Sequence, residues 1–258
     1  MKQLWNNFKV AFAMFSKIPM PPADWEKENM KYMLCFFPLI GMVIGLLTAG
    51  TAWLLELGDF SREFETAVLM LIPVFVTGGI HVDGLLDTAD ALSSWQERSR
   101  RLEILKDSHA GAFAVITAGV YFVSLFGAYS QLLMHRKALW ILGFGFMVSR
   151  CLSGIAVVCF PKARADGTVA QFSRNASDMV TRNVLLVFLV ILAVGMLLMQ
   201  PLYAAAALVS ALMVFWYYHH MAMKYFGGTT GDLAGYFLCL CELVMAVVLA
   251  AASGIGVV

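Results

Sequence analysis

Seven apolar runs dominate this sequence, and their lengths limit what the chain can fold into. Each run approaches or exceeds the roughly 20 apolar residues that a helix needs to cross a bilayer. We place them near residues 33–55, 66–82, 111–133, 138–160, 183–199, 202–222 and 234–254. The chain is 60% hydrophobic and 14% charged, whereas soluble domains are roughly 45–50% apolar and about 25% charged. The sequence therefore predicts an all-α, polytopic membrane helix bundle of about seven transmembrane helices, folded as a single domain over residues 1–258.

The least regular run is the second, because Pro73 lies inside it and its polar end leads into an aspartate motif. Ahead of the first run, residues 4–15 mix aromatic side chains with lysine, which predicts an amphipathic helix in the membrane interface. Three prolines (Pro19, Pro21 and Pro22) follow that helix and break the chain.

Positive charge is divided unevenly between the two sets of loops. Of the 18 lysines and arginines, the loops after the odd-numbered runs hold only Arg62, Arg136 and Lys137. Arg150 lies inside a run, and the remainder lie in residues 1–32, 83–110, 161–182 and 223–233. The positive-inside rule then predicts a cell (inner) membrane protein with its N-terminus cytoplasmic and its C-terminus outside. A net charge of +1 gives no indication of nucleic acid, so membrane lipid is the expected surrounding.

The most specific motif is GGIHVDGLLDTAD at residues 78–90. Asp83, Asp87 and Asp90 are spaced i, i+4 and i+7, so on a helix they share one face and repel one another. A hard divalent cation with carboxylate ligands relieves this repulsion, and Mg²⁺ keeps positions open for a substrate phosphate. The motif therefore predicts a Mg²⁺ site made by these three aspartates. The alternative is a solvated helix face where the chain leaves the membrane.

Glycines within this motif favour the functional interpretation. Gly78, Gly79 and Gly84 remove side chains beside the carboxylates, which a closely bound ligand would require. His81 falls on the opposite side of the helix from Asp83, so we interpret it as a structural or substrate-binding residue rather than a metal ligand. A helix that continued past the motif would carry Ser94, Glu97 and Arg101 on the aspartate face.

A second polar segment, residues 100–111, precedes the third run. We predict that Lys106 and Asp107 contact phosphate and metal. The alternative is a basic membrane anchor, with Asp107 or Ser108 capping a helix from about residue 110.

Arg150 lies near the middle of an apolar run, where a charged side chain is costly and is a functional candidate. Its planar fork suits a diphosphate. The alternative is a structural ion pair with Glu242. Arg164 follows near the cytoplasmic end of the same run.

A glycine-rich segment opens the last run, where backbone N–H groups and hydroxyls at a helix start can bind phosphate. The segment consists of Gly227, Gly228, Thr229, Thr230, Gly231 and Asp232. It lacks the GK[ST] ending of a P-loop. The alternative is a flexible turn in which Asp232 is the helix N-cap. All four segments fall on the predicted cytoplasmic side.

Taken together, these motifs resemble the cobalamin synthases. The likeness rests on GGIHVDGLLDTADAL, RRLEILKDSHAGAF and GGTTGDLAG at residues 78–92, 100–113 and 227–235, with support from FSKIPMP at residues 15–21 and from Arg150, Pro161, Arg164 and Gly167. It extends from about residue 12 to residue 242. His109 replaces an expected arginine, so no role carries over for that position, and Ala91 replaces a frequent glycine.

The resemblance implies an adenosylcobinamide-GDP ribazoletransferase, which joins adenosylcobinamide-GDP to α-ribazole or its 5′-phosphate and releases GMP with Mg²⁺ as cofactor. It implies that Asp83 and Asp87 bind Mg²⁺ and that Asp90 is a third ligand or the general base. Lys106, Arg150 and Arg164 would hold the diphosphate, with Asp107 beside them. Residues 227–232 would shape the nucleotide or ribazole side. A homo-oligomer, or a complex with other cobalamin-assembly enzymes, is left open.

Three other functions fit parts of the pattern. Prenyltransferases of membranes also use Mg²⁺ and aspartates, but usually with two DxxxD clusters, whereas the second acidic site here is Asp232 alone. CDP-alcohol phosphotransferases continue DG with xxAR, which is missing after Gly84. An ion-coupled transporter would place its acids near mid-bilayer, where only Glu242 is expected.

Overall fold

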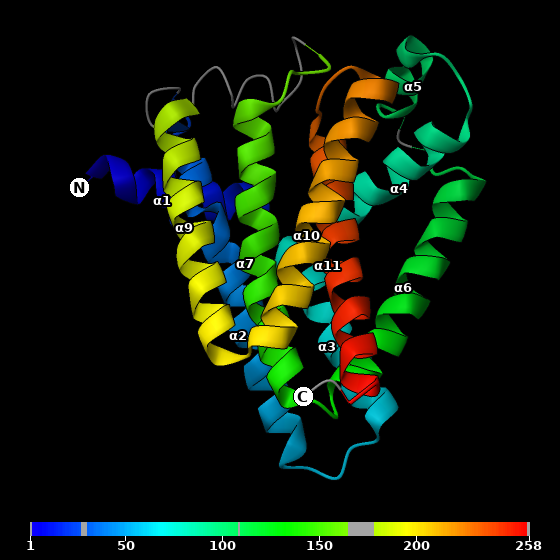
Figure 1. The fold of residues 1–258 in the computed structure, drawn as a ribbon. Coiled ribbons are helices and arrows are strands. Elements are labelled where there is room, and N and C mark those ends of the chain that lie inside the picture. Colours follow the sequence, from blue (N-terminus) through cyan, green and yellow to red (C-terminus); the bar gives the residue numbers. More distant parts are fainter. Residues whose placement is uncertain (1, 27–29, 108, 165–177, 257–258) are drawn as a thin grey trace.

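The computed structural model describes residues 2–26, 30–107, 109–164 and 178–256, which form helices and connecting loops without a β-strand (Figure 1). The α-helices are α1 (Lys2–Phe15), α2 (Phe37–Glu56), α3 (Arg62–Thr77), α4 (Ile80–Ser93), α5 (Arg98–Ile104), α6 (Ala112–Leu132), α7 (Arg136–Cys159), α9 (Asp178–Met199), α10 (Pro201–Met221) and α11 (Gly231–Gly254). A 3₁₀ turn, η2 (Met33–Phe36), leads into α2, and a π-helical turn, η3 (Ala222–Phe226), extends α10. The predicted all-α fold class is confirmed.

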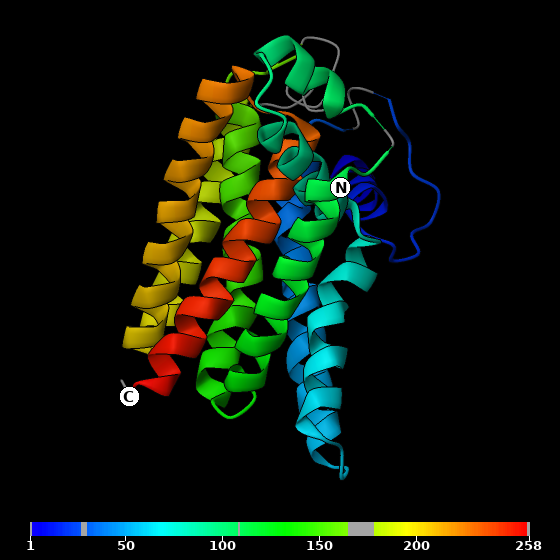
Figure 2. The ribbon, with the colours of Figure 1, turned by 90° about the vertical axis from the view of Figure 1, so that its right-hand side faces the viewer.

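Six of these helices are long and apolar enough to cross a membrane: η2 with α2, α6, α7, α9, α10 with η3, and α11. They coincide with six of the seven predicted runs. The remaining run, the second along the chain (residues 66–82), is divided between α3 and α4, which meet at an angle of 92° (Figure 2). The predicted end of that run was therefore wrong, and the count is seven only if this bent pair is one crossing.

Glycine, rather than proline, breaks the second run. Gly78 and Gly79 have φ angles of +66° and +80°, a left-handed conformation that glycine adopts without steric cost. Helix α3 passes through Pro73 and ends only at Thr77, whose hydroxyl donates to the Pro73 carbonyl at 2.7 Å. The bend turns α4 out of the bundle direction, so α4 lies outside the six crossing helices.

The described parts of the loops that are predicted on one side of a membrane lie at one end of the bundle. Figure 1 shows α4, α5 and the start of α11 at its upper end, whereas the C-terminus lies near the lower end. Helix α1 lies crosswise to the bundle at the upper end, with Leu4 and Trp5 exposed and Val10, Ala11 and Phe12 buried. This is the geometry expected of an interfacial helix.

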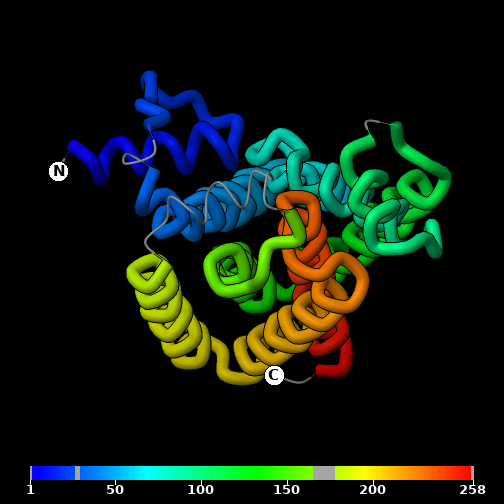
Figure 3. The backbone as a smooth tube through the Cα atoms, turned by 90° about the horizontal axis from the view of Figure 1, so that it is seen from above, coloured from blue at the N-terminus to red at the C-terminus, as the bar shows by residue number. Residues whose placement is uncertain are grey.

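The core is organised around α7, the most buried of the crossing helices (Figure 3). Small residues allow α2 to approach it closely. A Cβ atom added at Gly41 would lie 2.3 Å from the Phe146 carbonyl oxygen, and one added at Gly45 would lie 2.5 Å from that of Gly143. Packing of small residues is a common way to bring membrane helices together. This close packing of α2 on α7 helps to hold α7 at the centre of the bundle, where the Arg150 side chain is fully buried.

Candidate active site

Two predicted motifs meet where α4 crosses α11. A Cβ atom added at Gly84 would lie 2.5 Å from the carbonyl oxygen of Asp232, and one added at Gly235 would lie 3.1 Å from that of His81. The two backbones are therefore in direct contact at this crossing. Since Asp83 precedes Gly84, the contact brings the aspartate motif of α4 beside Asp232 at the start of α11.

The close approach of α4 and α11 leaves no room for a side chain at Gly84. Replacing Gly84 by Ala should lower the free energy of unfolding by about 1–3 kcal/mol, because the new methyl group meets backbone atoms that have no easy way to move. Gly119→Ala in α6 is a matched control, since a Cβ there meets nothing within 4 Å and alanine favours a helix by about 1 kcal/mol. Thermal unfolding in detergent measures both. Equal behaviour of the two variants would show that the crossing is not tight.

Negative charge accumulates at this crossing. Burial and, in decreasing order of importance, the charges of Asp83, Asp232 and Asp90 together raise the pKa of Asp87 to about 6. The carboxylate beside Asp83 and Asp87 that the sequence did not include in the cluster is thus Asp232. Asp83 and Asp232 are far apart in the sequence, and only the crossing of α4 and α11 brings them together. Spacing within one helix therefore could not predict that Asp232 belongs to the cluster.

Asp90 has a different principal partner, the first turn of α6. Its Oδ2 accepts a hydrogen bond from the Gly111 N–H at 2.6 Å, and its Oδ1 accepts one from the Ala114 N–H at 2.9 Å. A Cβ at Gly111 would lie 2.8 Å from Asp90 Oδ1, so this glycine makes room for the carboxylate. Asp90 therefore caps α6 and favours its positive dipole end.

The alternative role of Asp107 as the cap of this helix was wrong, because the N-cap of α6 is Gly111. The other candidate, Ser108, lies outside the described residues. The Asp107 carboxylate instead accepts from the backbone N–H of His109 at 3.0 Å and contacts its ring Nδ1 at 2.7 Å. These hydrogen bonds lower the pKa of Asp107. Lys106 and Asp107 are exposed on the loop between α5 and α6, at the same end of the bundle as the aspartates.

The glycine-rich segment pairs with the loop that follows α7. The Thr229 N–H donates to the Pro161 carbonyl at 2.8 Å, and the Ala163 N–H donates to the Thr229 carbonyl at 3.0 Å. A Cβ at Gly228 would lie 2.5 Å from the Pro161 carbonyl oxygen, so only glycine fits here. This pairing brings Arg164 within electrostatic reach of Asp232. The buried Arg164 Nη2 has no hydrogen-bond partner among the described residues.

The N-cap of α11 is Thr230, whose hydroxyl accepts from the Leu233 N–H at 3.2 Å. The alternative role of Asp232 as N-cap was therefore wrong. Helix α11 begins one residue before Asp232, so a cap at that position is already inside the helix. The Asp232 carboxylate lies instead 3.5 Å from the Thr230 hydroxyl and borders a cavity.

The aspartate helix does not continue toward Arg101, as the sequence had allowed. Helix α4 ends at Ser93, and the nearby Trp95 takes a φ of +54° that redirects the chain. Helix α5 then packs against η3: Arg98 donates to the Met223 carbonyl at 3.2 Å, and the Arg101 guanidinium lies 4.7 Å from the centre of the Tyr225 ring. Arg98 also covers Gly227, whose φ is +75°.

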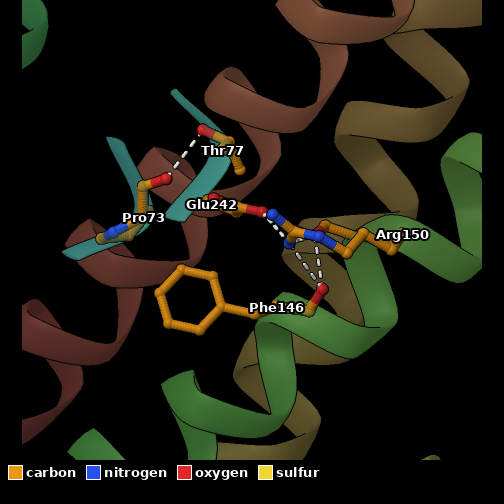
Figure 4. Close-up of polar contacts among 6 residues, drawn as sticks. Pro73, Thr77, Phe146, Arg150 and Glu242 are labelled. Atoms are coloured by element: carbon orange, nitrogen blue, oxygen red, sulfur yellow. Dashed lines mark hydrogen bonds and ion pairs between the residues drawn. The ribbon is translucent and has the colours of Figure 1, made fainter. Parts of the chain in front are cut away.

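Arg150 forms the buried ion pair that the sequence offered as the alternative (Figure 4). Its Nη1 lies 2.7 Å from Glu242 Oε1 and 2.8 Å from the Phe146 carbonyl oxygen. The Ser149 hydroxyl also donates to Glu242, at 2.8 Å. The Arg150 side chain is fully buried, and it borders a small cavity beside α3 rather than the larger one at the aspartates. The observed contacts are thus those of a structural pair.

A cavity of about 400 Å³ opens beside the carboxylates. Its polar lining consists of His81, Asp83, Ser153 and Asp232. Its apolar lining includes Met14, Phe15, Leu34, Phe37, Val157 and Leu238. His81 and Asp83 both border it because the cavity meets the first turn of α4, where residues from different sides of the helix are within reach. The sequence did not indicate Ser153 or the apolar wall.

The carboxylates at the crossing are the described residues that could hold a Mg²⁺ ion together with a phosphate. Among the described residues, no three His, Cys, Asp or Glu side chains are arranged to hold a metal by themselves. Mg²⁺ is commonly bound by one or two carboxylates plus substrate phosphates, so such a triad is not required. Asp83, Asp87 and Asp232 supply hard oxygen donors in a crowded, negatively charged site.

Comparison with known proteins gives one consistent result. Residues 7–250 match the family model described as cobalamin-5-phosphate synthase. An adenosylcobinamide-GDP ribazoletransferase from Lachnoclostridium phytofermentans is 47% identical over 253 residues, covering 97% of this chain and 95% of the relative. Proteins of the same name from Clostridium botulinum (strain Eklund 17B / Type B) and Desulfitobacterium hafniense (strain Y51) are each 32% identical, covering 95% and 94% of this chain and 96% and 94% of theirs. No solved structure matches the chain.

Proposed function

This chain belongs to the cobalamin-5-phosphate synthase family, and from that premise we propose how it acts as an adenosylcobinamide-GDP ribazoletransferase. The reaction joins adenosylcobinamide-GDP to α-ribazole or its 5′-phosphate and releases GMP. The observation that carries the proposal is the crossing of α4 and α11, because it places Asp83 and Asp232 together at the border of one cavity.

The transfer is a displacement at phosphorus. A ribose hydroxyl oxygen of the acceptor attacks the phosphorus on the cobinamide side of the diphosphate. The bond from that phosphorus to the bridging oxygen breaks, and GMP leaves with the bridging oxygen and its electron pair. The hydroxyl proton passes to a carboxylate. We assign this proton to Asp232, because it borders the cavity, whereas both oxygens of Asp90 already accept hydrogen bonds from α6.

Asp83 and Asp87 are proposed to hold Mg²⁺, with Asp232 close by. When bound, Mg²⁺ supplies positive charge to the phosphate oxygens on which negative charge develops. Arg164 is proposed to hold the diphosphate, since its buried Nη2 lacks a partner within the described structure and lies on the Asp232 side of the site. Lys106 is proposed to add a second cation at the rim. Arg150 is omitted from this group because it is paired with Glu242.

We further propose that the end of the bundle carrying α4, α5 and the start of α11 faces the cytoplasm of the cell. Most lysines and arginines outside the apolar runs lie in loops at this end, as the positive-inside rule requires. A cytoplasmic site also gives direct access to nucleotide substrates. The transporter alternative loses its main support, because Glu242, the acid expected at mid-bilayer, is paired with Arg150.

A direct assay tests the proposed function. The purified protein in detergent should release GMP from adenosylcobinamide-GDP only when α-ribazole and Mg²⁺ are both present, with one GMP per cobalamin formed. Chelation by EDTA should stop the reaction, and added Mg²⁺ should restore it. Absence of GMP release under every condition would refute the assigned activity. Undiminished release in EDTA would refute only the metal assignment.

A further inference from the structure

We propose that the cavity bordered by α1, α2, α4, α7 and α11 is the acceptor subsite, where the base of α-ribazole lies against the apolar wall and its ribose faces Asp83 and Asp232. The donor's diphosphate and corrinoid then remain outside, at the cytoplasmic rim. This inference rests on the proposed function and adds to it the place where each substrate binds and the residues that select the base.

Charge is the first argument. The lining of the cavity in the described structure contains two carboxylates and no lysine or arginine. A diphosphate deep inside it would be separated from Arg164 and Lys106, the two cationic side chains proposed to hold it, and would repel the Asp232 carboxylate. The Mg²⁺ proposed at Asp83 and Asp87 is better placed to bind the diphosphate from the rim. Arg164 interacts electrostatically with Asp232 but does not line the cavity. The part of a substrate that lies inside this cavity, against its apolar side chains, is therefore expected to be uncharged.

Size is the second argument. The cavity measures about 400 Å³, toward the lower end of the roughly 300–1,000 Å³ typical of small-molecule sites. This suits a single nucleoside. A corrin macrocycle with its amide side chains is far larger, so adenosylcobinamide-GDP does not fit inside. Donor and acceptor thus approach the carboxylates from different sides.

The chemistry of the wall is the third argument. Phe15 of α1 and Phe37 of α2 lie with ring centres 4.5 Å apart, and both border the cavity. Val157 of α7 and Leu238 of α11 add further apolar surface. A flat, uncharged benzimidazole base is complementary to such a surface, because bases stack on aromatic side chains largely independently of hydrogen bonding. Ser153 adds a hydroxyl to this otherwise largely apolar part of the lining.

Neighbouring valines of α7 allow a matched test. Val157 borders the cavity, whereas Val158 does not. The two valines are similarly buried, with 6% and 8% of their surface exposed. Val157→Phe should narrow the subsite and raise KM for α-ribazole at least about tenfold, with KM for adenosylcobinamide-GDP changed less than about twofold, in the range expected for a pocket filled by a few extra atoms. Val158→Phe should leave both KM values near those of the wild type.

A second variant guards against misfolding. Val157→Ala enlarges the cavity, so it should weaken the preference for α-ribazole over nucleosides with larger bases while the protein remains folded. In a separate binding measurement, α-ribazole alone should raise the thermal unfolding temperature of the wild type but not of Val157→Phe, whereas GMP should affect both equally. A rise in donor KM, or identical behaviour of the Val157 and Val158 variants, would overturn the inference. A wild type that releases no GMP would instead refute the proposed function.

Discussion

Replacing Asp83 by Asn should reduce GMP release by about 10³-fold or more, while insertion into the membrane stays unchanged and the unfolding temperature does not fall. The size of the loss is that expected when a group that acts on the transition state is removed. Asn preserves the shape of the side chain but removes its charge, and a neutral amide is a poorer ligand for Mg²⁺. The Asp83 side chain is exposed at the cavity, and no hydrogen bond or ion pair to another described residue fixes its carboxylate.

The stability of Asp83→Asn should not fall with its activity. Asp83 contributes to the repulsion at Asp87, so its neutralisation relieves a crowded group of acids and should leave the unfolding temperature equal or slightly higher. Glu103→Gln is the control, because Glu103 is an exposed acid at the same end of the bundle that pairs with Arg100 at 2.7 Å. Its turnover should equal that of the wild type. Full activity of Asp83→Asn at saturating Mg²⁺ would contradict the metal assignment.

The crossing helices could be predicted from the sequence because a bilayer imposes a simple requirement of length and apolarity. Six predicted runs coincide with six observed helices. The second run was different because a continuous apolar pattern does not reveal backbone direction. Only the paired left-handed glycines, Gly78 and Gly79, show that the chain turns by 92° there. The sequence alone is consistent with a role of these glycines in ligand access, whereas the structure shows that they form a bend.

The candidate site could be predicted in part. Spacing within one helix grouped Asp83, Asp87 and Asp90 correctly as neighbours, but it could not show that Asp90 turns toward α6 or that Asp232 approaches from α11. Both depend on contacts between segments distant in the sequence. The apolar wall of the cavity was also invisible, because Phe37 and Val157 look the same in the sequence as residues that face lipid.

Arg150→Met should lower the free energy of unfolding by about 3–5 kcal/mol, the usual consequence of removing one partner of a buried ion pair. The variant leaves the Glu242 carboxylate in the middle of the bundle with only the Ser149 hydroxyl to stabilise it. Glu242→Met should be similarly destabilising, since Arg150 is fully buried and would lose its one ion pair among the described residues, keeping its contacts with Phe146, Ser149 and the Phe37 ring. Thermal unfolding in detergent, compared with Ser149→Ala as a milder perturbation of the same network, measures the loss.

Combining the two substitutions separates the two roles considered for Arg150. In the double variant Arg150→Met, Glu242→Met, no buried charge is left alone, and two flexible side chains fill the space, so most of the lost stability should return. If Arg150 is structural, GMP release should return with it. If Arg150 instead holds the diphosphate, as the family resemblance implied, the double variant should be stable but inactive. Because Arg150 is paired with Glu242 and does not border the cavity that contains Asp83 and Asp232, we expect the first result.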